Sequence, residues 1–226
     1  MRVWLIVAAC LAMAACTTTQ AKLATTADRP SPNAEILALQ PDVQLAIITA
    51  GGVTEPRADW STAARDNIAA AIKAALSAKG LKYTALDPTT VESGRNAQLL
   101  RLNNAVGQAI LTYDYLIQLP THANGFDWTL GDGVKTLATT YGGDYALFVN
   151  ARGSYSSDAR KAVIVVAAVL GVSVPTGGQA LDASLVDMRT GRIVWFNVAQ
   201  ASPDADMRTP EGAQSLVKDV LKSAPF

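Results

Sequence analysis

A strand, a helix and a second strand follow one another over residues 43 to 86, and this order limits the possible folds most strongly. The segment Val43–Ala50 (VQLAIITA) is apolar, rich in β-branched residues and followed by two glycines, which is typical of a buried strand that runs into a loop. A helix is predicted over Ser61–Lys79, capped by its first residue and stopped at Gly80. Leu81–Leu86 predicts a short strand, so we expect both strands in one sheet.

The remaining pattern extends this α/β arrangement. Further helices are predicted over Ala97–Leu116, Asp158–Leu170 and Pro210–Ser223, with a short one starting at Thr129 or Asp132. Strands are predicted over Asp144–Arg152, Leu181–Asp187 and Arg192–Ala199, the last two joined by a turn at Met188–Gly191. A chain of 226 residues can bury one sizeable core. We expect one α/β domain over 42–226, with a mixed sheet flanked by helices.

The first sixteen residues, MRVWLIVAACLAMAAC, read as a targeting segment. One positive charge at Arg2 precedes an apolar stretch too short to cross a bilayer, and small residues then precede Cys16. Cleavage ahead of a cysteine resembles the bacterial lipoprotein signal, which predicts a signal peptide over 1–15 and acyl chains on Cys16. Two alternatives stay open: Cys10 as the acylated residue, after a shorter apolar stretch, and an ordinary secretory signal.

A polar, proline-punctuated segment follows the cysteine, TTTQAKLATTADRPSP over 17–32. We predict a flexible tether over 16–41 between the lipid and the domain. Acyl chains would anchor the protein stably, at about 0.8 kcal/mol per buried methylene. Thr17 is not the aspartate that retains lipoproteins at the inner membrane of enteric bacteria. The expected location is therefore the envelope of a Gram-negative bacterium, on the outer membrane and facing the periplasm.

Composition leaves few groups for catalysis. Lys plus Arg and Asp plus Glu both number 19, so no basic field exists to hold nucleic acid. One His and two Cys supply almost nothing for a metal site. We predict no catalytic, cofactor-binding or metal-ligating residues, no cofactor and no enzymatic activity.

Three patterns could still suggest a site. His122 with Ser154 or Ser156 lacks the G-x-S-x-G turn of a hydrolase, and it reads better as a solvated loop histidine. The glycines at 51 and 52 match no phosphate-loop motif. Trp60, Trp128 and Trp195 are expected in the core rather than as a ligand-binding shelf.

The run Ala162–Val174 is apolar except for Gly171 and Ser173. At about 20 Å as a helix it is too short to cross a bilayer of about 30 Å, and it lacks the alternation of a barrel strand. Two interpretations remain: a core element, or an exposed insertion over 158–178 that contacts membrane or protein. The exposed interpretation places the contact on five residues, Val163, Val165, Val166, Val169 and Leu170. Arg160 and Lys161, at the start of the helix, are then expected to serve a role outside it, at lipid headgroups.

Three features together resemble a known group of envelope proteins. They are the cysteine with its polar tether, the opening VQLAIITA…IAAAIKAAL, and the pair DYALFVNARG…ALDASLVDMRTGRIVWFN. They are similar to the CsgG-like lipoproteins of curli secretion and to the amino-terminal domain of TolB, over Asp42–Phe226. The resemblance implies helices on a mixed sheet and a role in envelope assembly or transport, and it brings no catalytic residues.

We therefore expect a lipid-anchored, non-catalytic interaction module. Its partners would be the membrane, through Cys16, and an envelope protein or further copies of this chain. The alternatives are a protein that binds or hydrolyses a small molecule or cell-wall glycan, and a secretion-pore subunit.

Overall fold

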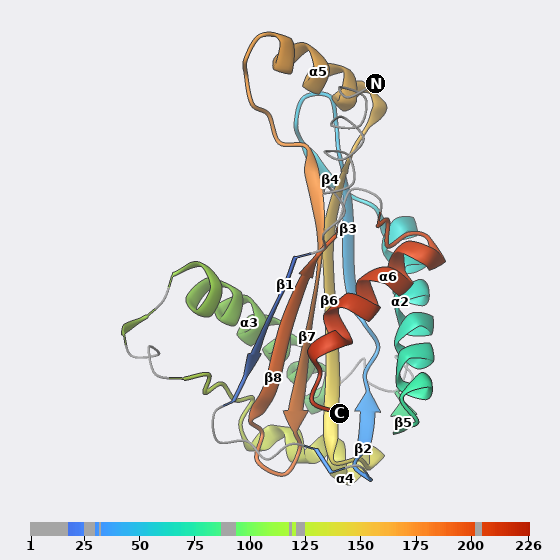
Figure 1. Cartoon of the computed structure of the whole chain (residues 1–226), viewed down its shortest axis with the longest axis vertical. Helices are drawn as coiled ribbons and strands as arrows, with labels where there is room; N and C mark the ends of the chain where they lie inside the picture. Colours follow the sequence, from blue (N-terminus) through green and yellow to red (C-terminus); the bar gives the residue numbers. More distant parts are fainter. Residues whose placement is uncertain are drawn as a thin grey trace, which may run out of the picture.

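Two strands, β6 (Tyr145–Ser156) and β7 (Gly177–Asp187), form an antiparallel ladder along the longest axis of the molecule (Figure 1). The structure is a computed structural model. It describes residues 18–24, 30–31, 33–86, 94–117, 119–120, 125–201 and 205–226. The ladder pairs Tyr145 with Asp187 at one end and Tyr155 with Gly177 at the other. All other strands are placed relative to it.

The described strands form one mixed sheet of eight. On one side of the ladder, β7 pairs antiparallel with β8 (Ile193–Gln200), which pairs antiparallel with β1 (Thr18–Leu23). On the other side, β6 pairs in parallel with β2 (Glu35–Ala38) along its first half and with β3 (Asp42–Ile48) along its second half. The outermost partners are β5 (Lys82–Ala85), parallel to β2, and β4 (Thr54–Pro56), antiparallel to β3. The predicted α/β fold with a mixed sheet is confirmed.

Helices cover both faces of the lower part of the sheet (Figure 1). α2 (Ala58–Ala78) and α6 (Pro210–Val220), which continues as a 3-10 turn over Leu221–Ser223, pack against one face around Trp195. α3 (Gly94–Ile110), the π-helical turn Leu111–Leu116, a 3-10 turn at Asp132–Val134 and α4 (Lys135–Tyr141) lie on the other side of the sheet. Each large aliphatic side chain buried in these layers contributes about 1.5–3 kcal/mol.

The predicted tether is wrong where the chain is described. Thr18–Leu23 forms the edge strand β1, in register from Thr18 opposite Gln200 to Leu23 opposite Trp195. Glu35–Ala38 forms β2 inside the sheet, so the domain does not begin at residue 42. The polar composition of 17–32 gave no sign of β1. An edge strand gains its stability from hydrogen bonds to the neighbouring strand rather than from buried side chains, so it needs no apolar pattern.

The start of α2 also differs from the prediction. The helix begins at Ala58, and Ser61 lies in its first turn instead of capping it. Its hydroxyl donates to the carbonyl oxygen of Arg57 (2.8 Å) and accepts from the amide of Leu45 (2.9 Å). Ser61 thus fixes the helix to β3, a role that only the tertiary structure reveals. Gly80 follows the helix with a φ of 66° and ends it, as predicted.

Apolar residues at three-and-four spacing predict the face of this helix that meets the sheet, namely Leu99, Leu102, Val106, Ile110, Tyr113 and Ile117. α3 presents a different face. Leu99 and Ile110 are buried as expected, but Leu102, Tyr113 and Ile117 are exposed. Asn103 and Gly107 take the central covered positions instead. They face polar side chains on the sheet, so apolar spacing alone could not identify the contact face.

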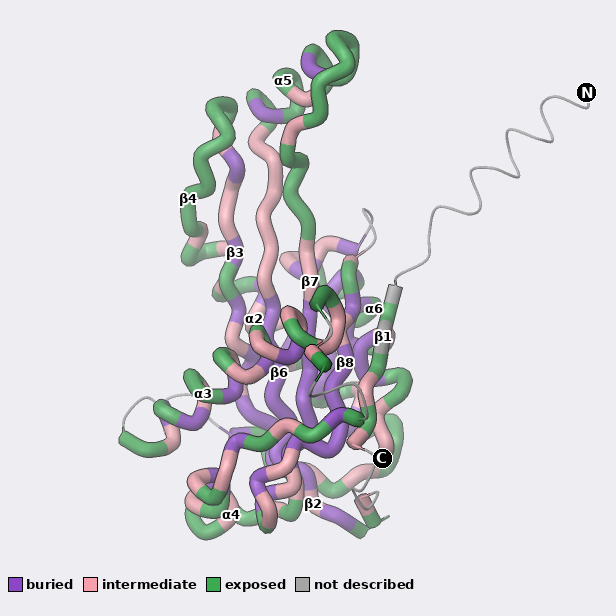
Figure 2. Tube along the Cα trace, turned by 90° about the vertical axis from the view of Figure 1, so that its left-hand side faces the viewer, coloured by how far each residue is buried: buried purple, intermediate pink, exposed green. Residues whose placement is uncertain are grey.

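The second half of the ladder projects beyond these layers and carries α5 (Asp158–Val169) at its end (Figure 1). Figure 2 shows the change along the axis, from buried residues in the lower sheet to half-buried and exposed residues in the projection. β3 and the β3–β4 turn accompany β6 and β7 there. The helix predicted over Asp158–Leu170 is confirmed.

Candidate functional site

The end of the projection is an apolar surface, here called the apolar tip and defined as residues 158–175. Its exposed large side chains are Val163, Val165, Val166, Val169, Leu170 and Val172, with Val169 83% exposed and Leu170 72% exposed. The five residues predicted as a contact surface are all among them. The interpretation of this run as a core element is therefore wrong for most of the helix, of which Ala167 is the one buried apolar residue.

The apolar tip carries no charge beyond its first turn. Asp158 and Lys161 form a 2.8 Å ion pair, with both side chains largely in solvent. No charged residue then occurs until Asp182. The exposed side chains from Ala162 to Val172 are apolar, and they offer a surface for apolar contact.

Arg160 fixes the base of the tip. Its guanidinium donates to the carbonyl oxygen of Pro175 (3.1 Å from Nη2) and to that of Ala50 (3.4 Å), in the β3–β4 turn. The side chain is buried. The prediction that Arg160 acts at lipid headgroups is wrong, because its donors satisfy carbonyl oxygens within the fold. Ser157 caps α5 by accepting from the amide of Arg160.

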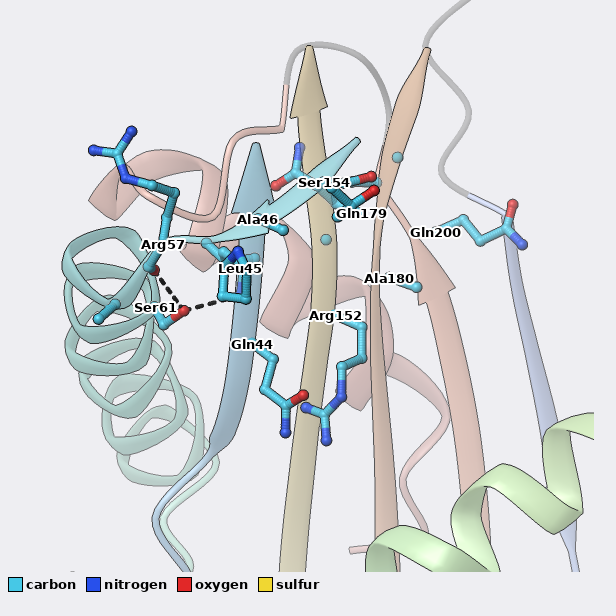
Figure 3. Close-up of a pocket in the computed structure, with 16 residues that line it drawn as sticks. Gln44, Leu45, Ala46, Arg57, Ser61, Arg152, Ser154, Gln179, Ala180 and Gln200 are labelled. Atoms are coloured by element: carbon cyan, nitrogen blue, oxygen red, sulfur yellow. Dashed lines mark hydrogen bonds between the residues drawn. The ribbon is translucent and has the colours of Figure 1, made fainter. Parts of the chain in front are cut away.

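Polar residues line the sheet next to the projection, on the face that α3 covers further down. Gln44, Arg152, Ala180 and Gln200 lie opposite one another on β3, β6, β7 and β8, and Figure 3 shows them as a row across the sheet. They line part of an open cavity of about 930 Å³. This surface, here called the polar row, is open to solvent and has hydrogen-bonding groups at its centre.

Below the polar row, a network of buried polar groups lies under α3. Nδ2 of Asn150 donates to the carboxylate of Asp182 (2.7 Å), and Oγ of Ser184 donates to Asn103 of α3 (2.8 Å). Arg152 forms a 2.6 Å ion pair with Asp42. Burial raises the pKa of Asp182 to about 6, against the hydrogen bond from Asn150 and the charge of Arg152, which favour ionisation.

Sequence reasoning missed this network. Its members come from four separate segments that only the sheet brings together: Asp42, Asn103, Asn150 with Arg152, and Asp182 with Ser184. The available signal was the run of polar residues at every second position, Asn150–Arg152 and Asp182–Ser184, within otherwise apolar strands. Such alternation inside two central strands indicates a polar patch on one face of the sheet.

The candidate catalytic residues do not assemble in the described part of the chain. Ser154 and Ser156 lie on β6, and the hydroxyl of Ser156 donates to the carbonyl oxygen of Thr176. His122 and Cys16 lie outside the described residues. Gly52 has a φ of 84° in the turn between β3 and β4, where the structure needs a tight reversal.

Trp60, Trp128 and Trp195 do not form a ligand-binding shelf. Trp195 is fully buried, whereas Trp60 packs against the edge of the same cluster, with the guanidinium groups of Arg57 (4.2 Å) and Arg208 (4.4 Å) over its ring. Trp128 packs in the cluster on the opposite side of the sheet, and its indole donates to Asp114. The prediction that they serve the core holds for Trp195, while Trp60 and Trp128 are only partly buried.

Among the described residues, no three His, Cys, Asp or Glu side chains come close enough to hold a metal ion. The described helices also include none with the length and hydropathy needed to cross a membrane.

No family model matches the chain, and no curated protein matches it. Two similar solved structures are PelC dodecamers from Paraburkholderia phytofirmans. One, a point variant in space group C2, is 12% identical with a TM-score of 0.42, over 93% of this chain and 97% of that chain. The other, in space group P6, is 12% identical with a TM-score of 0.39, over 92% and 98%. At these values the similarity carries no argument about function or assembly.

Proposed function

We propose that this chain is a lipid-anchored, non-catalytic protein of a Gram-negative cell envelope, and that its α/β domain is an assembly or interaction module facing the periplasm. The amino-terminal sequence supports the anchor, with acyl chains on Cys16 and the outer membrane as the expected location. The apolar tip is the observation that carries the interaction role. Six exposed large apolar side chains gathered at one end of a projection form the kind of patch that marks contact surfaces.

The anchor can be tested in cells with a clickable fatty acid. Wild type should be labelled, Cys16→Ala should lose the label, and Cys10→Ala serves as the matched control and should keep it. Label that survives Cys16→Ala but not Cys10→Ala would move the anchor to Cys10. No label on any of the three would remove the anchor from the proposal.

The interaction role needs a separate test. A photo-crosslinking amino acid at Leu170, 72% exposed on the apolar tip, should capture an envelope protein, a second copy or lipid in intact cells. The same probe at Leu102, 41% exposed on α3, is the control. Equal products from both positions, or none from Leu170, would argue against the tip as the contact surface.

The polar row favours a second candidate function, binding of a small molecule or cell-wall glycan. Amide and guanidinium groups from Gln44, Gln200 and Arg152 border an open cavity, and such groups suit a ligand rich in hydroxyls and amides. Titration of the protein with soluble muropeptides would detect this binding by calorimetry. Arg152→Ala and Gln44→Ala should weaken a true site, and absence of heat with wild type would discount it.

A further inference from the structure

We propose that the apolar tip inserts into the headgroup region of the same membrane that holds the acyl chains of Cys16. The anchor in this statement rests on the proposed function, whereas the properties of the tip do not. Four observations carry the inference: the circumference of α5 that is exposed, its length, the distribution of charge, and the place where the chain enters the sheet.

The exposed part of α5 is too broad for a docking seam. With 100° between successive residues, the exposed positions from Ala162 to Leu170 extend over about 220° of the circumference. Only Ile164 and Ala167 face the rest of the fold. A surface helix ordinarily shows an apolar stripe of about 100°, and a helix that is apolar nearly all round is surrounded by apolar material. A bilayer interface can surround α5, whereas one flat protein surface covers a single side.

The length of α5 limits how deep it goes. Its 12 residues extend about 18 Å, well short of the roughly 30 Å of a hydrocarbon core. α5 can therefore enter the membrane interface but cannot cross the bilayer, and the inference places it about 5–10 Å deep, where interfacial helices lie.

The distribution of charge fits a boundary between lipid and water at the base of the helix. Asp158 and Lys161 pair with each other in the first turn, and Arg160 is buried against carbonyl oxygens. Every exposed side chain from Ala162 to Ser173 is uncharged. The tip can therefore enter an apolar region without leaving an unpaired charge there.

The chain enters the sheet on the side of the tip. β1 begins at Thr18, which pairs with Gln200 of β8. Gln200 pairs with Ala180 of β7, and Ala180 pairs with Arg152 of β6, so Thr18 and Arg152 lie at the same height in the sheet. Cys16 precedes Thr18 by two residues in the sequence, and two residues of chain reach at most about 7 Å. From Arg152, β6 continues by four residues to Ser156, about 13 Å toward α5.

The acyl anchor and the apolar tip can therefore contact the same membrane if the sheet is tilted from the membrane normal. β1 lies three strands from β6 in the order β1-β8-β7-β6, about 14 Å to the side. An offset of similar size along and across the strands corresponds to a sheet tilted by roughly half a right angle from the membrane normal. Because only Thr17 separates Cys16 from β1 in the sequence, acyl chains on Cys16 would hold the domain against the membrane rather than at a distance from it.

The test uses the native acylated protein with single nitroxide labels, in vesicles of phosphatidylethanolamine and phosphatidylglycerol. The chain contains two cysteines, Cys10 and Cys16, so after cleavage and acylation an introduced cysteine is the one free thiol. Val169→Cys and Val165→Cys report on the tip. Leu116→Cys, 81% exposed against 83% for Val169, is the matched control away from the tip.

Labels at both tip positions should collide at least severalfold more with oxygen than with a water-soluble nickel complex, at a depth of about 5–10 Å, while the Leu116 label should favour nickel. Equal nickel collisions at Val169 and Leu116 would overturn the inference. Shielding from both reagents with spin–spin broadening would also overturn it, and would show that a second copy covers the tip. Mass analysis of the same samples separates the two claims. If the protein is acylated but the tip labels are exposed to water, the anchor stands and the insertion is refuted. If the protein carries no acyl chains but the tip labels are exposed to lipid, the insertion stands and the anchor is refuted.

Discussion

Asn150 and Asp182 form a buried pair beneath α3, in which the amide donates a 2.7 Å hydrogen bond to the carboxylate. Burial raises the pKa of Asp182 to about 6, above the value of about 3.9 in an unfolded chain. The folded state therefore binds the proton more tightly, and the contribution of this group to the free energy of unfolding falls as pH rises from about 4 to about 6. At pH 7 the buried, ionised carboxylate of Asp182 lowers the free energy of unfolding by about 3 kcal/mol.

Asp182→Asn should remove this slope. Urea denaturation from pH 4 to pH 7 should show the variant gaining stability relative to wild type as pH rises, by up to about 3 kcal/mol. Asp66→Asn on the exposed side of α2 is the control and should follow wild type. Parallel curves for wild type and Asp182→Asn would show that Asp182 titrates normally.

Two helical glycines should respond oppositely to alanine. A Cβ at Gly107 would have its nearest neighbour, Oδ2 of Asp182, at 3.6 Å, whereas one at Gly212 would lie 2.1 Å from the carbonyl oxygen of Asp206. Gly107→Ala should stabilise by about 0.5–1 kcal/mol through helix propensity. Gly212→Ala should destabilise by about 1–3 kcal/mol through overpacking. Thermal unfolding of both variants checks the pair, and a loss of stability in Gly107→Ala would contradict this account of α3 packing.

The base of the projection is tied to the segment before α6 through Tyr155. Its hydroxyl donates to the carboxylate of Asp206 (2.8 Å), and Arg208 lies over its ring at 3.8 Å. Burial raises the pKa of Tyr155, so the hydroxyl keeps its proton in alkaline solution. Tyr155→Phe should cost about 1 kcal/mol in the free energy of unfolding. Tyr113→Phe, on an exposed ring, should leave the free energy of unfolding unchanged. Equal losses in the two variants would show that the hydrogen bond from Tyr155 to Asp206 does not stabilise the fold.

The apolar tip should be dispensable for folding. Val165→Asp with Val169→Asp places charges at positions 64% and 83% exposed, so the free energy of unfolding should change by no more than about 0.5 kcal/mol. Leu45→Asp, at a position 2% exposed in β3, should prevent folding. Circular dichroism with urea denaturation measures both. Loss of folding in the double variant would show instead that this segment is part of the core.

The sequence predicted elements that carry their own periodic pattern and missed those that depend on neighbours. α5 and the strands around Leu147 and Leu185 follow from apolar runs and their flanks. β1 could not be predicted, because a polar edge strand is specified by its partner β8. The contact face of α3 was misplaced because Asn103 and Gly107 match a polar patch on the sheet rather than an apolar one.

The candidate surfaces divide in the same way. Five residues of the apolar tip were named from one contiguous run under one of two open interpretations, and the structure shows those side chains exposed. The polar row could not be predicted, because Gln44, Arg152 and Gln200 become neighbours only through strand register.

The acyl anchor on Cys16, on which the proposed function rests, is best measured by mass spectrometry of the amino-terminal peptide of the native protein. We expect the mature chain to begin at Cys16, with diacylglycerol in thioether linkage on its sulfur and an acyl chain on its amino group. A mature chain that begins at another residue, or that carries Cys16 as a free thiol, would contradict it.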